Sequence, residues 1–170
     1  GIKQSVSFNA NGYDSDFVIQ YTDENLFLGA RHGSFDFFDG QIDDVRIYNR
    51  VLSAEEIKAL YGHYSDKYQS SVTVGDGITD GLVGYWPMNE SQGSYVYDYS
   101  PRTDNWGKFF GPYLDFDGVD DYVDVGDRED YKFRQNSFTL STWIKTEGLD
   151  WEIIMNKRGS DSAWYRWSLN

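Results

Sequence analysis

The sequence predicts an all-β fold of short strands joined by tight turns. Aromatic residues are abundant, with 14 Tyr, 11 Phe and 6 Trp, and 17 glycines supply turn positions. Aromatic residues fit the pleated surface of a strand, and long helical patterns are missing. Short strand-like segments bounded by turn residues recur along the chain, which is typical of a sandwich or a barrel.

The first part of the chain, residues 1–62, is expected to form strands that end in one helix. Strands are predicted at 5–10, 16–21 and 26–31. A turn at Gly40 then leads into a strand with two adjacent carboxylates. The period of two places one set of its residues on one face: Ile42, Asp44, Arg46 and Tyr48. The other face then carries the intervening residues: Asp43, Val45 and Ile47.

One short helix is expected near 53–61. Ser53 is a good N-cap, and Glu56 three residues later completes a capping box. Leu52 and Ile57 are placed to form a hydrophobic staple, and Gly62 is expected to end the helix. Residues 63–80 have the composition of a linker, with a possible strand at 70–74.

The strand pattern resumes in residues 81–170. Expected strands lie at 82–88, 95–100, 113–118, 121–126, 137–145, 151–157 and 163–170. Residues 115–130 are rich in acids, and the Asp117-Gly118 pair is a strong turn signal that predicts a hairpin there. The acids left over are expected either to bind Ca²⁺ or to keep an edge strand from pairing wrongly.

Charge and composition exclude several classes of function. Lys and Arg total 15 against 28 Asp and Glu, a net charge of −13, so nucleic acid is not an expected partner. The acidity fits either solubility or binding of a hard cation such as Ca²⁺. Cysteine is absent, which removes disulfides and thiolate chemistry. No segment is apolar over a length that would span a membrane, and a start at Gly1 without Met predicts an excerpt or a processed piece.

Two stretches of the chain resemble a known family. GLVGYWPMNESQGSYVYDYS, LDFDGVDDYVDVGD and SFTLSTWIKT resemble the opening of a laminin G-like domain, of the concanavalin A-like jelly-roll class. LFLGARHGSFDFFDGQIDDVRIYNRVLSAEEIKALY resembles the close of such a domain. The resemblance implies an all-β, concanavalin A-like jelly-roll sandwich of antiparallel sheets with the one short helix.

The order of the two stretches is reversed with respect to the family. Residues 1–62 resemble the C-terminal half of a domain, 63–80 a linker, and 81–170 the N-terminal half of a domain. Four arrangements fit this order: a window from a tandem array, one unit of identical repeats, a circular permutant, or subunits that exchange halves. The halves would then be completed by a neighbouring copy or by packing together. Tandem copies suit a fibre or a stalk.

The resemblance also implies a structural Ca²⁺ site. In related jelly rolls, an acidic residue of the closing strand binds the ion together with a loop of the opening half. The matching positions here are Asp43, Asp44, Glu90, Asp98, Asp117 and Gly118. Ca²⁺ needs six to eight oxygen ligands, which carboxylates, carbonyls and water can supply. The alternative is that one aspartate pairs with Arg46 or Arg50 and the others are solvated.

The sequence predicts no enzyme, because the paired-carboxylate strand motif of the family's glucanases and other catalytic motifs are not found. We expect an extracellular or cell-surface structural repeat, stabilised by Ca²⁺, that assembles with other copies of the same domain into a filament, stalk or matrix. The alternative is a lectin-like carbohydrate-binding or adhesion module, on its own or as the accessory domain of an enzyme, in which aromatic side chains stack on glycans. The tryptophans placed for that role are Trp106, Trp151 and Trp164, whereas Trp86 and Trp143 are expected in the core.

Overall fold

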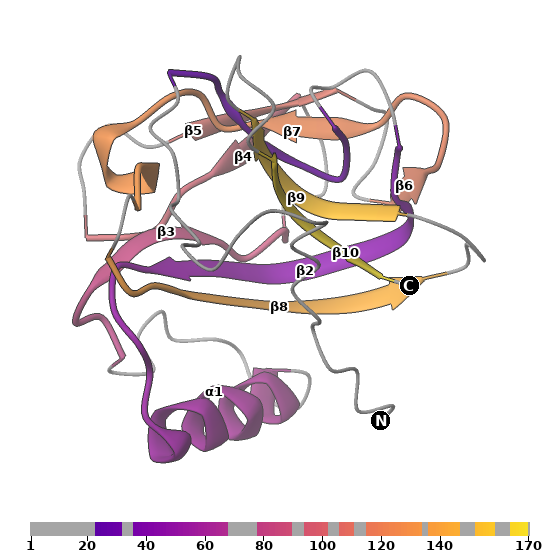
Figure 1. Ribbon diagram of the computed structural model, residues 1–170. Helices are drawn as coiled ribbons and strands as arrows, with labels where there is room; N and C mark the ends of the chain where they lie inside the picture. Colours follow the sequence, from indigo (N-terminus) through magenta and orange to yellow (C-terminus); the bar gives the residue numbers. More distant parts are fainter. Residues whose placement is uncertain are drawn as a thin grey trace.

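A computed structural model shows two antiparallel β-sheets packed face to face, with a helix below them (Figure 1). Strands and one α-helix are therefore arranged as the sequence predicts for the fold class. The structure describes these residues: 23–31, 36–67, 78–89, 94–101, 106–110, 115–133, 136–146, 152–158 and 164–169.

One layer is a six-stranded sheet, which runs from the top of Figure 1 to the middle of the molecule. Its strand order is β10-β9-β1-β7-β5-β4. The bounds are β1 Leu26–Leu28, β4 Tyr95–Tyr97, β5 Trp106–Phe110, β7 Tyr122–Asp124, β9 Glu152–Arg158 and β10 Trp164–Leu169. The short β1 lies in the middle of this sheet, between β7 and β9. A segment from the start of the described chain is therefore held between two strands from its second half.

The other layer is built around β2 (Asp39–Tyr48). β8 (Thr139–Thr146) pairs along one edge of β2, and β3 (Leu82–Trp86) and β6 (Asp115–Asp117) pair with the two ends of its other edge. All of these partners come from the part of the chain after residue 80. Within this structure, the segment that resembles a domain's close pairs with the segment that resembles a domain's opening. The division into two half domains with a linker stays a prediction.

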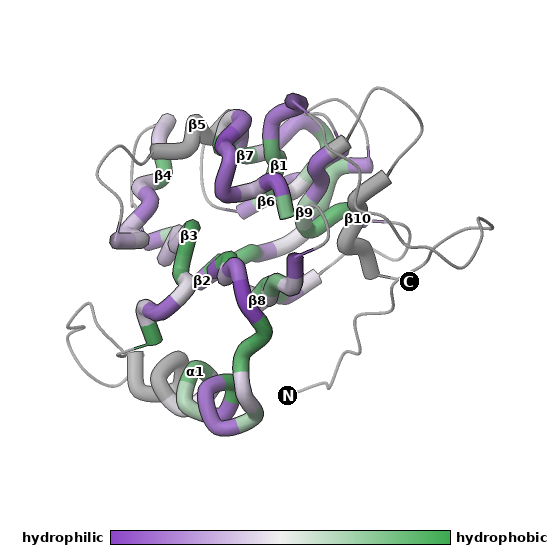
Figure 2. The backbone as a smooth tube through the Cα atoms, turned by 60° about the vertical axis from the view of Figure 1, so that its left-hand side comes forward, coloured by the Kyte–Doolittle hydropathy of each residue, from purple (hydrophilic) through white to green (hydrophobic). Residues whose placement is uncertain are grey.

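A single apolar core fills the space between the two sheets. Its largest fully buried members are Phe38, Trp86, Phe116 and Tyr131, which the two layers and their connections contribute. Figure 2 shows the hydrophobic stretches of β2, β3 and β9 in the middle of the molecule. The prediction that Trp86 is a core residue is confirmed, because its side chain is 1% exposed. Trp143 is only partly buried and contacts Tyr61 of the helix.

The strand β2 contains a bulge at its two aspartates. Its register with β8 shifts between Asp43 and Arg46, and Asp44 has a φ of 54°. The extra residue reverses the alternation, so Ile42 lies in the same core as Val45 and Ile47. The prediction that Ile42 shares a face with Asp44, Arg46 and Tyr48 is therefore wrong. Aspartate suits this position because its short polar side chain tolerates the left-handed region better than most residues.

The helix α1 (Ala54–Lys67) covers the outer face of the β2 sheet. Leu60 on this helix packs with Tyr48 and Leu82 in a second buried cluster. The capping box is confirmed: Glu56 N donates to Ser53 Oγ at 3.2 Å, and Ser53 N donates to Glu56 Oε2 at 2.8 Å. Ile57 is 54% exposed. The staple with Leu52 stays a prediction.

Gly62 does not end the helix, which continues to Lys67. Among the described residues, none would meet a Cβ at Gly62, so their packing does not require a glycine or a turn there. Glycine in a helix interior costs only about 1 kcal/mol relative to alanine, a penalty that a capped and packed helix tolerates. The helix thus extends into the segment assigned to the linker, and Ile78 of that segment is buried in the second cluster.

Three further expectations differ from the structure. Gly40 lies inside β2 rather than in a turn, and its φ of 138° brings the backbone against the Lys145 carbonyl, where no Cβ would fit. The strand β5 was not anticipated, because its residues follow a stretch rich in turn formers.

The segments β6 and β7 form no hairpin, since β6 pairs with β2 and β7 with β1 and β5. Phe116 and Val123 are both buried in the core, from opposite sheets. The expected strands at 5–10, 16–21 and 70–74 lie outside the described residues.

Candidate functional site

Three aspartates lie together in the turn that connects the two sheets after β6. Asp117, Asp120 and Asp121 each offer a carboxylate oxygen, and these oxygens lie within 4.8 Å of one another. Within the described ranges, they form the one group of three or more acidic or histidine side chains close enough to hold a metal ion. We call these residues the acidic turn.

The local sequence dictates the shape of the acidic turn. Gly118 has a φ of 74°, which glycine adopts without steric cost. Asp117 Oδ1 accepts a hydrogen bond from Val119 N at 2.8 Å, the pattern by which an aspartate nucleates a turn. On either side, Phe116 and Val123 are buried in the core and fix the ends of the turn. The three carboxylates therefore belong to a segment held by its own hydrogen bonds and by its anchors.

Asp121 is the buried member of the acidic turn. Its residue is 1% exposed, and its Oδ2 accepts a hydrogen bond from Asp117 N at 3.1 Å. Its Oδ1 is buried and has no hydrogen-bond partner. Burial raises the pKa of the Asp121 carboxyl above its ordinary value, and the charges of Asp117 and Asp120 raise it further. An orphaned buried carboxylate oxygen is costly, so a cation at this position would relieve the penalty.

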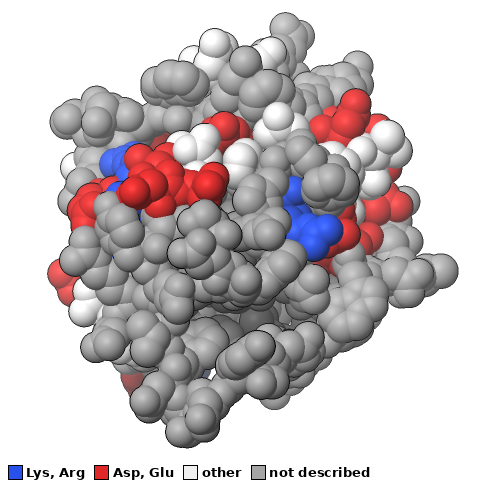
Figure 3. Space-filling view, turned by 45° about the horizontal axis from the view of Figure 1, so that its top comes forward, with Lys and Arg blue, Asp and Glu red and all other residues white. Residues whose placement is uncertain are grey.

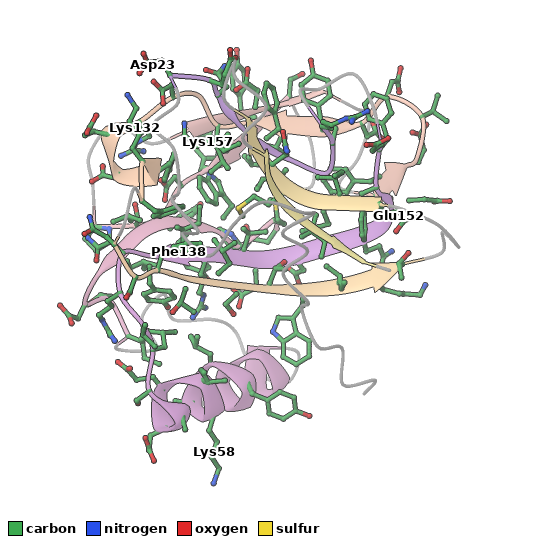
Figure 4. The ribbon with its side chains drawn as sticks, viewed as in Figure 1. Asp23, Lys58, Lys132, Phe138, Glu152 and Lys157 are labelled. Carbon is green, nitrogen blue, oxygen red and sulfur yellow. The ribbon has the colours of Figure 1, made fainter. Side chains whose placement is uncertain are left out.

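No lysine or arginine of the described residues forms an ion pair with the acidic turn. Elsewhere, acids and bases are matched: Lys157 Nζ lies 2.8 Å from Asp127 Oδ1, and Lys132 Nζ lies 2.9 Å from Asp23 Oδ1 (Figure 4). Burial lowers the pKa of Lys157, while the neighbouring Asp127 works in the opposite direction. Figure 3 shows acidic groups gathered in patches on the upper face of the molecule. The acidic turn is thus a concentration of negative charge without a matching base.

The chemistry of the acidic turn fits a hard divalent cation. Carboxylate oxygens are the ligands that Ca²⁺ prefers, and backbone carbonyls and water complete its shell. Asp117, Asp120 and Asp121 would supply the carboxylates. Of these, only Asp117 and the adjacent Gly118 were expected from the sequence. Asp120 and Asp121 stood in the recognised acidic stretch, but the sequence does not show which of its acids converge. The sequence feature that could have indicated Asp121 is its position between the apolar residues Phe116 and Val123.

Two other expected ligands are engaged in the structure by other groups. Asp44 is buried and accepts a hydrogen bond from Arg46 Nη2 at 3.1 Å. Asp98 Oδ1 accepts from the backbone N of Tyr85 and of Ser100, both at 2.8 Å, and its Oδ2 lies 3.4 Å from Arg128. The structure does not bring either of them into the acidic turn. Their role as ligands stays a prediction.

Five candidates remain, and the structure describes them in part or not at all. Asp43 lies at the bulge of β2, where its carbonyl accepts a hydrogen bond from Thr142 Oγ1 at 3.0 Å. Glu90 and Trp151 lie outside the described residues. For Trp106, in β5, the structure describes the backbone, which pairs with Tyr97.

Trp164 begins β10, where its backbone pairs with Arg158. Among the side chains that the structure describes, exposed aromatic rings lie on β4 and just after it, and also on α1, where Tyr61 is 62% exposed. Tyr95, Tyr97 and Tyr99 are 48%, 53% and 45% exposed. None of the three was singled out from the sequence.

Comparison with known proteins now adds to the geometry. The laminin G model of the concanavalin A-like lectin/glucanases superfamily matches residues 6–58. This part of the chain is therefore similar to laminin G domains. The match includes β1 from the six-stranded sheet, β2 from the other sheet and the start of the helix α1. Comparisons with curated proteins and with solved structures give no significant match.

The similarity to the laminin G model concerns residues 6–58 and leaves the ligand open. Domains of this class serve as binding or structural modules, typically outside cells, and the same fold carries different functions in different proteins. Of the helices in the described part of the chain, none has the length and apolarity that a membrane crossing needs.

Proposed function

We propose that this chain is an extracellular, non-catalytic structural module whose sandwich is stabilised by Ca²⁺ bound at the acidic turn. The observation that carries the proposal is the set of three unmatched carboxylates around the orphaned Oδ1 of Asp121. The laminin G-like match supports the extracellular and non-catalytic parts of the proposal. In this view, the ion contributes to the stability of the fold and to no reaction.

The proposed work of the module is assembly with other copies of the same domain. In the described part of the chain, β1 and β2 pair with strands from residues 82–158. Because the two segments are joined through one connection, the same pairing is possible between copies, which would link them into a filament, stalk or matrix. Such exchange needs no new contact surface, since it reuses the interface already formed within one chain.

The experiment is thermal unfolding of the full chain with and without Ca²⁺. A ligand at about 100 times its dissociation constant stabilises by about 2.7 kcal/mol. For a domain of this size, that raises the Tm by roughly 5–10 °C. Asp121→Asn should remove the shift, because asparagine keeps an acceptor for Asp117 N but loses the charge. The matched control is Asp115→Asn, on the exposed side of β6, which should keep the shift. An unchanged Tm in the native protein, or a full shift in Asp121→Asn, would refute the Ca²⁺ part.

A second candidate function is glycan binding, favoured by the exposed tyrosines of β4. Tyr95 and Tyr97 flank the buried Val96 on an edge strand of the six-stranded sheet, and Tyr99 follows. Exposed aromatic rings provide stacking surfaces for sugars as readily as for protein partners. A glycan array with and without chelator tests this candidate. Binding that Tyr97→Ala abolishes and Tyr61→Ala does not would favour the glycan-binding module over the structural one.

A further inference from the structure

The acidic turn does not stand alone, because Asp39 of β2 lies directly across the ladder from Asp117 of β6. Residues opposite each other in an antiparallel pair have Cβ atoms about 5 Å apart, and like charges in such a pair are destabilising. The next pair on the same face of these two strands is Gln41 and Asp115, which carries a single charge. The repulsion is therefore specific to the end of the ladder where the acidic turn begins.

The side chain of Asp39 packs against the turn itself. A Cβ placed on Gly118 would lie 3.0 Å from Cβ and 3.6 Å from Oδ2 of Asp39. Gly118 N also donates to the Phe38 carbonyl at 3.1 Å, so the turn is fastened to the start of β2. The carboxylate of Asp39 thus faces the residue next to Asp117.

No base of the described residues neutralises Asp39 by an ion pair. Its other neighbour is a further carboxylate: Glu152 Oε1 accepts from Asp39 N at 3.3 Å, and Glu152 Oε2 accepts from Thr146 Oγ1 at 2.6 Å. Figure 4 shows Glu152 at the end of the molecule where β2 begins. Lys145 is the nearest base by register, and it lies opposite Gln41 on the other edge of β2. The negative charge at this end of β2 is therefore unbalanced within the described chain.

We infer that the cation of the acidic turn acts across the β2–β6 ladder. The carboxylate of Asp39 is then a fourth negative charge that attracts the ion, beside those of Asp117, Asp120 and Asp121. This inference rests on the proposed Ca²⁺ site. The ion replaces the repulsion between Asp39 and Asp117 by a shared attraction, and so holds β6 on β2. β2 belongs to the N-terminal segment of the chain and β6 to the segment after residue 80. The cation therefore stabilises a strand pairing between the two segments of the sandwich. Removal of the cation weakens the pairing of β6 with β2 before it affects the rest of the core.

The variant Asp39→Asn should have opposite effects in the absence and in the presence of Ca²⁺. Asp39→Asn removes the repulsion, so without Ca²⁺ the amides of β6 should exchange more slowly, by up to about fivefold. With Ca²⁺, the same variant loses part of the field that attracts the ion, and its affinity for Ca²⁺ should fall at least about tenfold. Asp115→Asn is the matched control, because it makes the same change two residues from Asp117 but faces a neutral partner. Both of its readouts should stay at native values.

The measurements are hydrogen exchange by mass spectrometry and calorimetric titration with CaCl₂, both on the full chain. In the native protein, Ca²⁺ should protect the peptides that contain β6 and the start of β2 more than those of β9. Native Ca²⁺ affinity in Asp39→Asn, or an exchange rate of β6 that Ca²⁺ does not change, would overturn the inference while leaving the Ca²⁺ site in place. If the native protein bound no Ca²⁺ at all, both the site and the inference would fall.

Discussion

At the scale of single residues, the adjacent carboxylates Asp43 and Asp44 have different roles in β2. Asp44 takes the left-handed backbone conformation of the bulge, and its side chain is buried beside Arg46. The guanidinium of Arg46 lies 4.4 Å from the centre of the Tyr85 ring. Burial raises the pKa of Tyr85 to about 12, and the charge of Asp44 contributes to the rise. The bulge thus holds Asp44, Arg46 and Tyr85 together as one polar cluster.

Neutralising Asp44 should destabilise the protein strongly. Asp44→Asn keeps the backbone conformation but removes the negative charge that lies 3.1 Å from Nη2 of the buried Arg46 guanidinium. Removing one partner of a buried pair typically costs about 3–5 kcal/mol. Urea denaturation should therefore show a free energy of unfolding lower by about that amount, whereas the exposed Asp115→Asn should change it by less than about 0.5 kcal/mol. A native value for Asp44→Asn would show that the pair contributes no net stability.

At the scale of the elements, helix α1 is fixed at its N-terminus by more than the capping box. Glu56 Oε1 lies 2.6 Å from Arg50 Nη2, and Arg50 follows the end of β2. The hydrogen bond from Arg50, followed by that from the Ser53 backbone, lowers the pKa of Glu56 to about 2. The cap therefore ties the start of the helix to the strand before it, and through it the helix is positioned on the sheet.

Acid should dissolve this cap in a defined window of pH. Because the pKa of Glu56 is lower in the folded state than its ordinary value near 4.3, its stabilisation is present above that value and disappears as the pH falls toward 2. Glu56→Gln should lower the Tm at pH 7 and leave it unchanged near pH 2, as followed by circular dichroism. Glu55→Gln, in the same turn, serves as control. A difference of equal size at both pH values would contradict the assignment.

At the scale of the whole molecule, β2 determines how the sandwich closes. It is flanked by β8 on one edge and by β3 and β6 on the other, and its inward residues join the core that both sheets share. The helix that follows it covers the opposite face. Removing β2 would expose the edges of three strands and half of the core, so neither segment is expected to be stable by itself.

Fragments of the chain should accordingly fold only together. Residues 1–70 and 71–170, prepared separately, are expected to show poorly dispersed NMR spectra, and an equimolar mixture should recover the spectrum of the intact chain. Ile47→Asp in the first fragment should prevent recovery, because Ile47 is fully buried in the shared core. A well-dispersed spectrum from the second fragment alone would show that β2 is dispensable, and would also argue against exchange of segments between copies.

The sequence was informative wherever a short pattern has a single structural solution. The all-β class, most strand positions and the capping box of Ser53 and Glu56 follow from alternation, turn residues and spacing. The laminin G-like character of residues 6–58 could also be seen from the residues. For the candidate site, the acidic stretch and the turn at Asp117-Gly118 were visible. The selection of Asp120 and Asp121 was not, because convergence of side chains depends on the fold of the turn.

Only the tertiary structure decided which residues share a face and which strands share a sheet. A bulge at Asp44 moves Ile42 to the core, because one inserted residue reverses a period of two. The turn at Gly118 sends β6 and β7 into different sheets, since Phe116 and Val123 fill one core from opposite sides. The sequence by itself therefore determined the elements and their class. Long-range packing determined their partners, and with them the charge that gathers where Asp39 meets the acidic turn.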